Sequence, residues 1–136
     1  MLFRSAGIVF EAVPEVIDAK RDAFAFAAHH LRPDALLAST TSTFLVTQLA
    51  AFAPAPERFL NAHWLNPAHL IPLVELSAHP GTAPEASASM SALLEGIGKV
   101  PVMCAPAPGY IVPRLQSLIM NEAARMIEQE IGRAHV

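Results

Sequence analysis

The amino-acid sequence predicts an α/β fold with a largely parallel sheet, and two features carry this prediction. Short apolar runs rich in β-branched residues alternate along the chain with stretches whose apolar residues recur at helical spacing. The chain has 136 residues, 53% of them hydrophobic, which is enough for one compact domain with its own core. No internal repeat or low-complexity linker divides the chain. We therefore expect one layered unit in which helices cover a sheet.

The first strand and the first helix are predicted within residues 6–31. The run A-G-I-V-F-E-A-V at 6–13 is apolar and contains β-branched and aromatic residues, so it predicts a buried strand, which Pro14 ends. Residues 15–31 carry apolar side chains at helical spacing and predict an amphipathic helix. Lys20 is the residue that interrupts the apolar face of this helix.

The following segments continue the alternation of strand and helix. Residues 35–39 predict a second short strand. The polar loop after it leads into a predicted helix at 44–52, for which Thr43 is a suitable N-cap.

Two helices and a strand are predicted in the last third of the chain. Residues 84–94 predict a helix with a proline in its first turn. Residues 100–105 predict a strand, and its proline indicates an edge or strand-start position. A hinge rich in proline and glycine then precedes a longer predicted helix at 110–129.

The stretch 59–76 holds a candidate catalytic pair. Pro67 and Pro72 separate two apolar arms and exclude a central strand or a helix interior, so the chain must turn between the arms. A strand, a bend and a returning strand place His63 beside Glu75, whereas a helix would not bring residues twelve apart together. A carboxylate beside an imidazole fixes its tautomer and favours its protonated form, which suits a general base. The alternative is an ordinary core or surface histidine, since the chain has six.

The segment H-W-L-N-P-A-H-L-I-P-L-V-E at 63–75 resembles the H-x-x-N-P…L-V-E segment of the 3-hydroxyacyl-CoA dehydrogenases. The resemblance extends over residues 6–128 through E-A-V-P-E-V-I-D-A-K, S-T-T-S-T, G-K-V-P-V and A-P-G-Y-I-V-P-R. It implies that His63 is the catalytic base, which takes the proton of a 3-hydroxyl while hydride leaves the same carbon for NAD. It also implies that Glu75 holds the imidazole and that Ser42 hydrogen-bonds the substrate oxygen or the nicotinamide. The alternative for Ser42 is an ordinary loop or capping serine.

The resemblance implies NAD as the cofactor and no metal. It assigns contact with NAD to Ala12 (through its backbone), Glu15, Lys20, Thr40, Ser42 and Asn66. Thr40 stands where the family has an Asn. Each assignment has a simpler alternative, because charged residues on a surface helix are usually only solvated and an Asn before proline often forms an Asx-turn.

The resemblance also implies a particular division of the chain. The fingerprint G-x-G-x-x-G of dinucleotide-binding domains is absent, since the glycines lie at 7, 81, 96, 98, 109 and 132. In the family this loop precedes the strand that contains Phe10. Residues 6–105 would then form the C-terminal half of a Rossmann-type NAD-binding domain, and residues 106–129 would begin an all-helical domain.

The two ends of the chain read differently from the rest. M-L-F-R-S at 1–5 and E-I-G-R-A-H-V at 130–136 match the translated ends of a sequencing adapter. We therefore expect residues 1–5 and 130–136 to be non-native and the chain itself to be an inactive fragment. The alternative is that both are natural tails.

The function implied by the resemblance is that of an NAD-dependent oxidoreductase of fatty acid β-oxidation. Its substrates would be short 3-hydroxyacyl-CoA esters such as 3-hydroxybutyryl-CoA, and its parent protein a homodimer. Pro113 stands where the family often has an Asn that holds the thioester end, and Asn121 is a candidate replacement. This departure keeps a dehydrogenase of a non-CoA hydroxy acid, of carnitine or gulonate type, as an alternative. A non-catalytic module of the same fold is another, against which Ser42, His63 and Glu75 argue.

Composition narrows the possible partners and the location. The net charge is −3 and no basic stripe occurs, so we expect no nucleic-acid partner. No apolar run approaches the ~20 residues needed to span a bilayer, so we expect no membrane partner. The single cysteine, Cys104, lies in an apolar run, which predicts a buried structural thiol and fits a reducing cytoplasm.

Overall fold

The computed structural model describes residues 5–132 of the chain. Its centre is a five-stranded sheet in the order β1-β2-β3-β4-β5, whose strands are Ile8–Glu11, Leu36–Ser39, Phe59–Trp64, Leu73–Ser77 and Val100–Met103. β1, β2 and β3 are parallel, β4 and β5 are parallel, and β3 and β4 are antiparallel. The prediction of a largely parallel sheet is confirmed.

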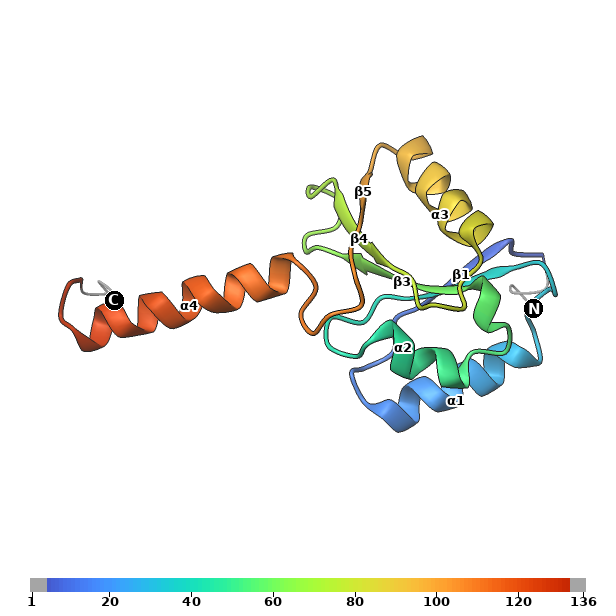
Figure 1. Cartoon of the computed structure of the whole chain (residues 1–136), viewed down its shortest axis with the longest axis horizontal. Coiled ribbons are helices and arrows are strands. Elements are labelled where there is room, and N and C mark those ends of the chain that lie inside the picture. Colours follow the sequence, from blue (N-terminus) through green and yellow to red (C-terminus); the bar gives the residue numbers. More distant parts are fainter. Residues whose placement is uncertain (1–4, 133–136) are drawn as a thin grey trace.

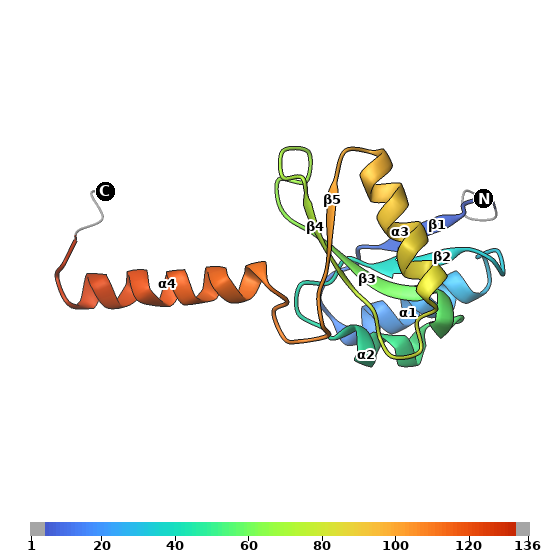
Figure 2. The same cartoon turned by 45° about the horizontal axis from the view of Figure 1, so that its top comes forward.

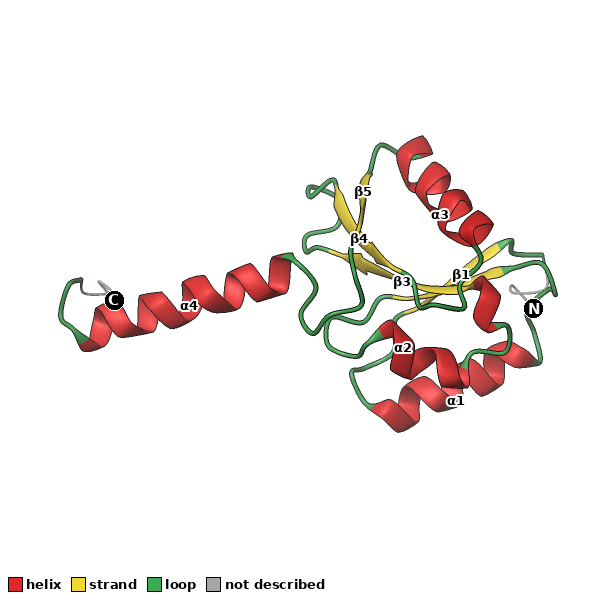
Figure 3. Ribbon diagram, in the orientation of Figure 1, coloured by secondary structure: helices red, strands yellow, loops and turns green. Residues whose placement is uncertain are grey.

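Helices cover both faces of the sheet (Figure 1). On one face lie α1, Ile17–Ala28, and α2, Val46–Leu49, which continues into the 3-10 turn η1, Ala50–Phe52. On the other face lies α3, Pro84–Gly96. A second 3-10 turn, η2 at Pro56–Arg58, leads into β3. The layers of helix, sheet and helix are visible in Figures 2 and 3, so the α/β class is confirmed.

The alternation of side chains along β3 produces two apolar clusters, one on each face of the sheet. Phe59 points to the face of α1 and α2, where its ring meets Phe24 edge to face with centroids 5.3 Å apart. Leu60 and Ala62 belong to the cluster on the other face, together with Met90 of α3. Because His63 lies four residues after Phe59, it shares the face of α1 and α2 and not that of α3.

One predicted helix start is wrong. The second helix begins at Val46, its N-cap is Leu45, and Thr43 does not cap it. The reason is that the hydroxyl of Thr41 already accepts the backbone N–H groups of Thr43 (3.2 Å) and Phe44 (3.0 Å), which shapes a loop before the helix. The first free N–H of the helix, that of Leu45, is accepted by the side chain of Gln48 at 3.2 Å.

The two prolines that the sequence placed at element starts lie as predicted. Pro84 occupies the first turn of α3, where its missing N–H costs nothing. Pro101 lies in β5, which is an edge strand of the described sheet.

The last helix, α4, Val112–Glu128, extends away from the sheet without packing on it (Figures 1 and 2). It has no buried residue. Its exposed apolar side chains are those of Leu115, Leu118, Ile119, Met120, Met126 and Ile127. No helix among the described residues has the length and apolar character needed to cross a membrane. Most of the residues expected to be non-native, 1–4 and 133–136, lie outside the described part of the chain.

Candidate active site

His63 and Glu75 form a direct cross-strand pair. They stand opposite each other in the antiparallel ladder of β3 and β4, and the His63 Nδ1 lies 2.7 Å from the Glu75 Oε2. His63 is 5% exposed and Glu75 is fully buried. A strand, a bend and a returning strand therefore bring the two side chains together, as the positions of Pro67 and Pro72 predicted.

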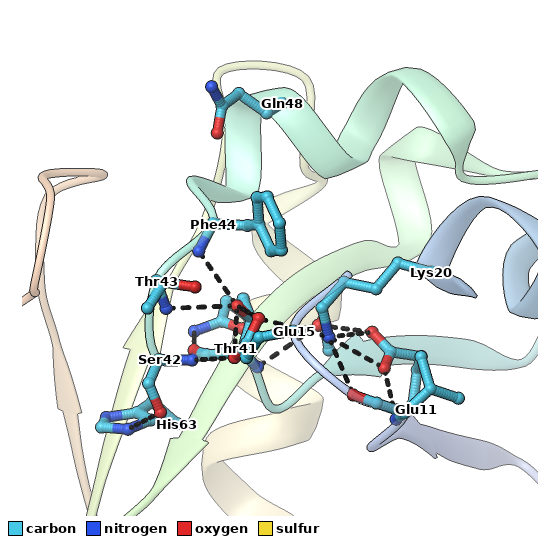
Figure 4. A network of polar contacts seen from close by, with 12 residues as sticks. Glu11, Glu15, Lys20, Thr41, Ser42, Thr43, Phe44, Gln48 and His63 are labelled. Carbon is cyan, nitrogen blue, oxygen red and sulfur yellow. Dashed lines mark hydrogen bonds and ion pairs between the residues drawn. The ribbon is translucent and has the colours of Figure 1, made fainter. Parts of the chain in front are cut away.

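The other nitrogen of the same imidazole contacts Ser42. The Ser42 Oγ lies 2.9 Å from the His63 Nε2, and Ser42 is exposed in the loop that follows β2 (Figure 4). With Glu75 ionised, Nδ1–H donates to the carboxylate and Nε2 accepts the Ser42 O–H. The three predicted catalytic residues thus form one hydrogen-bonded chain that ends at the exposed residue Ser42.

A contact that the sequence did not reveal lies on the far side of Glu75. Its Oε1 accepts the backbone N–H groups of Ile111 and Val112, each at 2.8 Å. These two residues stand at the start of α4, so the carboxylate that orients His63 also caps this helix. No local sequence signal marks the contact, because Glu75 and Ile111 are 36 positions apart.

A buried ion pair lies beside the loop that carries Ser42. The Lys20 Nζ donates to the Glu11 Oε1 at 3.0 Å and to Oε2 at 3.2 Å, and Lys20 is 1% exposed (Figure 4). Ser39 donates to the same Glu11 carboxylate at 2.7 Å. Lys20 is therefore not a solvated helix residue. It lies on the apolar face of α1 because Glu11, at the end of β1, supplies the opposite charge.

Glu15 joins this ion pair to the Ser42 loop. Its carboxylate accepts the Thr41 hydroxyl, at 2.7 Å to Oε2, and the Ser42 N–H at 2.8 Å, and it lies 3.7 Å from the Lys20 Nζ. Burial raises the pKa of Glu15, but the hydrogen bonds from Thr41 and Ser42 and the charge of Lys20 outweigh burial, so the pKa is lowered from its ordinary value. Glu15 thus remains an anion that holds the loop in place.

The remaining residues assigned to NAD lie along the side of the sheet at which the parallel strands β1, β2 and β3 end. Ala12, Thr40 and Asn66 follow the carboxyl ends of β1, β2 and, with one intervening residue, β3. Ala12 and Asn66 are exposed, and Thr40 is half-buried. This is the edge at which open α/β sheets bind ligands. Lys20 is the exception, since its amino group is enclosed by Glu11 and Val13.

A cleft opens beside the imidazole. It has a volume of about 280 Å³ and is lined by Ser42, His63, Trp64, Leu65, Asn66, Pro113 and Gln116. Pro113, which stands where the family often has an Asn, therefore lies at the cleft. The proposed replacement Asn121 does not line it, whereas Gln116, one turn beyond Pro113, brings an amide to it.

Cys104 differs from its prediction, because it is half-buried and not fully buried. Its Sγ donates to the Leu76 carbonyl at 3.3 Å. Burial, followed by the nearby charge of Glu75, raises the pKa of the Cys104 thiol to about 11. A thiol with this pKa is a poor nucleophile at neutral pH.

Comparison with known proteins shows the family of the chain. Residues 2–107 match the family described as 3-hydroxyacyl-CoA dehydrogenase, NAD binding domain. The chain is 35% identical over 127 residues to 5-formyl-3-hydroxy-2-methylpyridine 4-carboxylate 5-dehydrogenase of Mesorhizobium japonicum, covering 93% of the chain and 41% of the relative. It is 35% identical over 132 residues to 3-hydroxyadipyl-CoA dehydrogenase of Escherichia coli, covering 97% of the chain and 28% of the relative.

A solved structure is similar as well. The structure of 3-hydroxybutyryl-CoA dehydrogenase from Escherichia coli matches with a TM-score of 0.87 at 35% identity, over 95% of this chain and 27% of that one. The chain therefore spans less than half the length of each of these proteins.

Proposed function

The chain belongs to the 3-hydroxyacyl-CoA dehydrogenase family, and from this premise we propose that the whole protein transfers hydride between NAD and the 3-hydroxyl carbon of a 3-hydroxyacyl-CoA. The observation that carries the proposal is the chain of hydrogen bonds from Ser42 to His63 and from His63 to Glu75, at the ligand-binding edge of the sheet. A buried carboxylate behind an imidazole whose other nitrogen faces a cleft is suited to proton transfer.

The residues of this chain would act on the proton of the substrate. The His63 Nε2, which now accepts the Ser42 O–H, would instead accept the proton of the 3-hydroxyl. Glu75 would stabilise the imidazolium that forms, since its Oε2 already contacts Nδ1. Ser42 would then be free to donate its hydroxyl to the substrate oxygen. NAD, when bound, supplies the acceptor for the hydride that leaves the same carbon.

We assign the nicotinamide half of NAD to the edge formed by Ala12, Glu15, Thr40, Ser42 and Asn66. The donor set fits, because it offers exposed backbone, an anionic carboxylate and hydroxyl and amide side chains next to the imidazole. Lys20 would act indirectly, by holding Glu11 and Glu15. The residues do not supply a pyrophosphate site, because the chain contains no G-x-G-x-x-G.

We propose a short acyl-CoA as the substrate. The cleft of about 280 Å³ offers Leu65 for an acyl chain and Gln116 for a carbonyl, whereas the Trp64 ring packs on the opposite face of the sheet. Gln116 would replace the amide that Pro113 lacks. The relative that acts on 3-hydroxyadipyl-CoA and the structure named for 3-hydroxybutyryl-CoA support this class.

We further propose that residues 6–105 belong to the NAD-binding domain and that residues 106–129 begin the helical domain. The absence of any buried residue in α4 supports this division, because the helix gains its packing elsewhere. A homodimeric assembly and a cytoplasmic location are proposed from the family.

A dehydrogenase of a non-CoA hydroxy acid is the second candidate. It is supported by Pro113 at the cleft and by the relative named for 5-formyl-3-hydroxy-2-methylpyridine 4-carboxylate, which carries no CoA in its name.

A chimera tests the proposal. This chain replaces the matching segment of the Escherichia coli 3-hydroxyadipyl-CoA dehydrogenase, and NADH oxidation is measured with acetoacetyl-CoA and with dehydrocarnitine. His63→Gln should lower the rate by ~10²–10⁴-fold, the usual contribution of a general base. The matched control is His69→Gln, an exposed histidine in the bend between β3 and β4. A cooperatively folded chimera whose rate is unaffected by His63→Gln would contradict the proposal, and turnover of dehydrocarnitine alone would favour the second candidate.

A further inference from the structure

Tyr110 is a buried residue in an unusual conformation beside the candidate site. It is 5% exposed, follows Gly109 in the turn before α4 and has a φ of 41°. Residues other than glycine rarely adopt this left-handed region, which costs on the order of 1 kcal/mol or more. The contacts of its side chain must therefore hold it there.

Those contacts join two parts of the site. The Tyr110 ring stacks on the His63 imidazole, with centroids 5.6 Å apart and planes inclined by 24°. Its hydroxyl donates to the carbonyl oxygen of Phe44 at 2.9 Å. Phe44 is two residues beyond Ser42 in the same loop (Figure 4). One side chain thus contacts the imidazole and the loop that presents the serine hydroxyl to it.

The backbone after Tyr110 adds a third contact. The N–H groups of Ile111 and Val112 both bind the Glu75 carboxylate. The ring and the turn therefore contact His63 and Glu75 directly, and the hydroxyl binds the loop that carries Ser42. Each contact limits a different motion: tilt of the imidazole, drift of the loop and rotation of the carboxylate.

The hydroxyl itself is not suited to proton transfer. Burial, followed by the charges of Cys104, Glu15 and Glu75, raises the pKa of Tyr110 far above its ordinary value. The hydroxyl therefore remains a neutral donor, and its hydrogen is committed to the Phe44 carbonyl.

We propose that Tyr110 is a positioning residue, whose ring holds the plane of the His63 imidazole and whose hydroxyl fastens the loop that carries Ser42. The kinetic part of this inference rests on the proposed function. The rate of proton transfer falls steeply when the donor and the acceptor are misplaced. Loss of this support should therefore lower kcat and leave KM for the substrate nearly unchanged.

Two substitutions separate the two contacts. Tyr110→Phe keeps the ring and removes the hydroxyl, and Tyr110→Leu removes both. Phe24→Leu is the matched control, because Phe24 is also buried and packed on another ring but contacts Phe59 instead of the site. It reports what loss of a buried aromatic does to stability alone.

Nuclear magnetic resonance of the full 136-residue chain with labelled histidine provides the structural readout, with His63→Gln to assign the signal. Tyr110→Phe should keep the ring-current shift of the His63 ring protons and weaken their through-space contact with Ser42. Tyr110→Leu should lose both, and Phe24→Leu should keep both. Unchanged His63 shifts and Ser42 contacts in Tyr110→Phe and Tyr110→Leu would overturn the inference. If Tyr110→Leu does not fold, Tyr110→Phe alone decides, through the Ser42 contact.

The kinetic readout uses the chimera described above. Tyr110→Leu should lower kcat by ~10–10²-fold, and Tyr110→Phe by less, with KM for acetoacetyl-CoA unchanged. An equal loss in Phe24→Leu would overturn the positioning role. If His63→Gln leaves the rate unchanged, the proposed function fails, and the resonance measurement still decides the structural claim.

Discussion

The buried pair of Lys20 and Glu11 offers a sharp test of the structure. Replacing Lys20 by Met removes the cation that pairs with the Glu11 carboxylate, and the side chain of Glu11 is only 4% exposed. Removing one partner of a buried, hydrogen-bonded pair costs about 3–5 kcal/mol, because the desolvation of the other charge is no longer compensated. For a domain of this size, with a urea dependence of about 2 kcal/mol per molar, the unfolding midpoint should fall by about 2 M.

The assay is urea unfolding followed by circular dichroism. The matched control is Arg21→Met on the same helix, because the ion pair of Arg21 with Asp18 is exposed. Exposed pairs contribute about 0–1 kcal/mol, so the control should shift the midpoint by less than about 0.5 M. The double variant Lys20→Met/Glu11→Gln removes both charges and should recover at least half of the loss. Equal midpoints for Lys20→Met and Arg21→Met would refute the reasoning, since they would mean that Lys20 is solvated.

Three further predictions follow from the site. Glu75→Gln in the chimera should lower kcat less than His63→Gln does. It should also speed amide hydrogen exchange at Ile111 and Val112, because the carboxylate uses one oxygen for His63 and the other for these two N–H groups, whereas a glutamine amide has a single acceptor oxygen. Exchange protection equal to that of the unsubstituted protein would contradict the shared carboxylate. Cys104, with its pKa of about 11, should react with iodoacetamide at pH 8 about 10²-fold more slowly than free cysteine does, as measured by mass spectrometry. The labelling rate should rise about tenfold per pH unit toward pH 11. Labelling at the rate of free cysteine would show that the thiol is solvated. The isolated chain should bind NAD only very weakly, because it contains no glycine-rich loop for the pyrophosphate, and micromolar affinity by calorimetry would contradict this.

The strands and helices were predictable because their signals are local. The apolar run at 6–13 and the helical spacing at 15–31 each need only near neighbours in the chain. Pro67 and Pro72 forced a turn, and the turn placed His63 opposite Glu75. The start of α2 was missed because the Thr41 hydroxyl, and not Thr43, satisfies the loop amides. Competing capping groups within a few residues look alike in sequence.

Lys20 shows where sequence reasoning reached its limit. The charge appeared as an interruption of an apolar helix face, and the ordinary expectation for such a residue is solvation. Its burial depends on Glu11 at the end of β1 and on Ser39 at the end of β2, two strands whose pairing decides which carboxylate the amine meets. Pairing of parallel strands is a tertiary event, so the sequence names the charges without matching them.

By itself, the sequence determined the α/β class and the order of the elements, because periodicity and proline positions act over short distances along the chain. The two prolines allowed His63 to meet Glu75, and the family resemblance selected this histidine among the six. Only the tertiary structure decided that Ser42 reaches the imidazole, that Tyr110 covers it and that Glu75 caps α4. These contacts join residues 21 to 47 positions apart, through loops whose path depends on the packing of the whole sheet. The physical reason is that hydrogen bonds and ring stacking require partners within a few ångströms, and no local pattern encodes which distant segments meet.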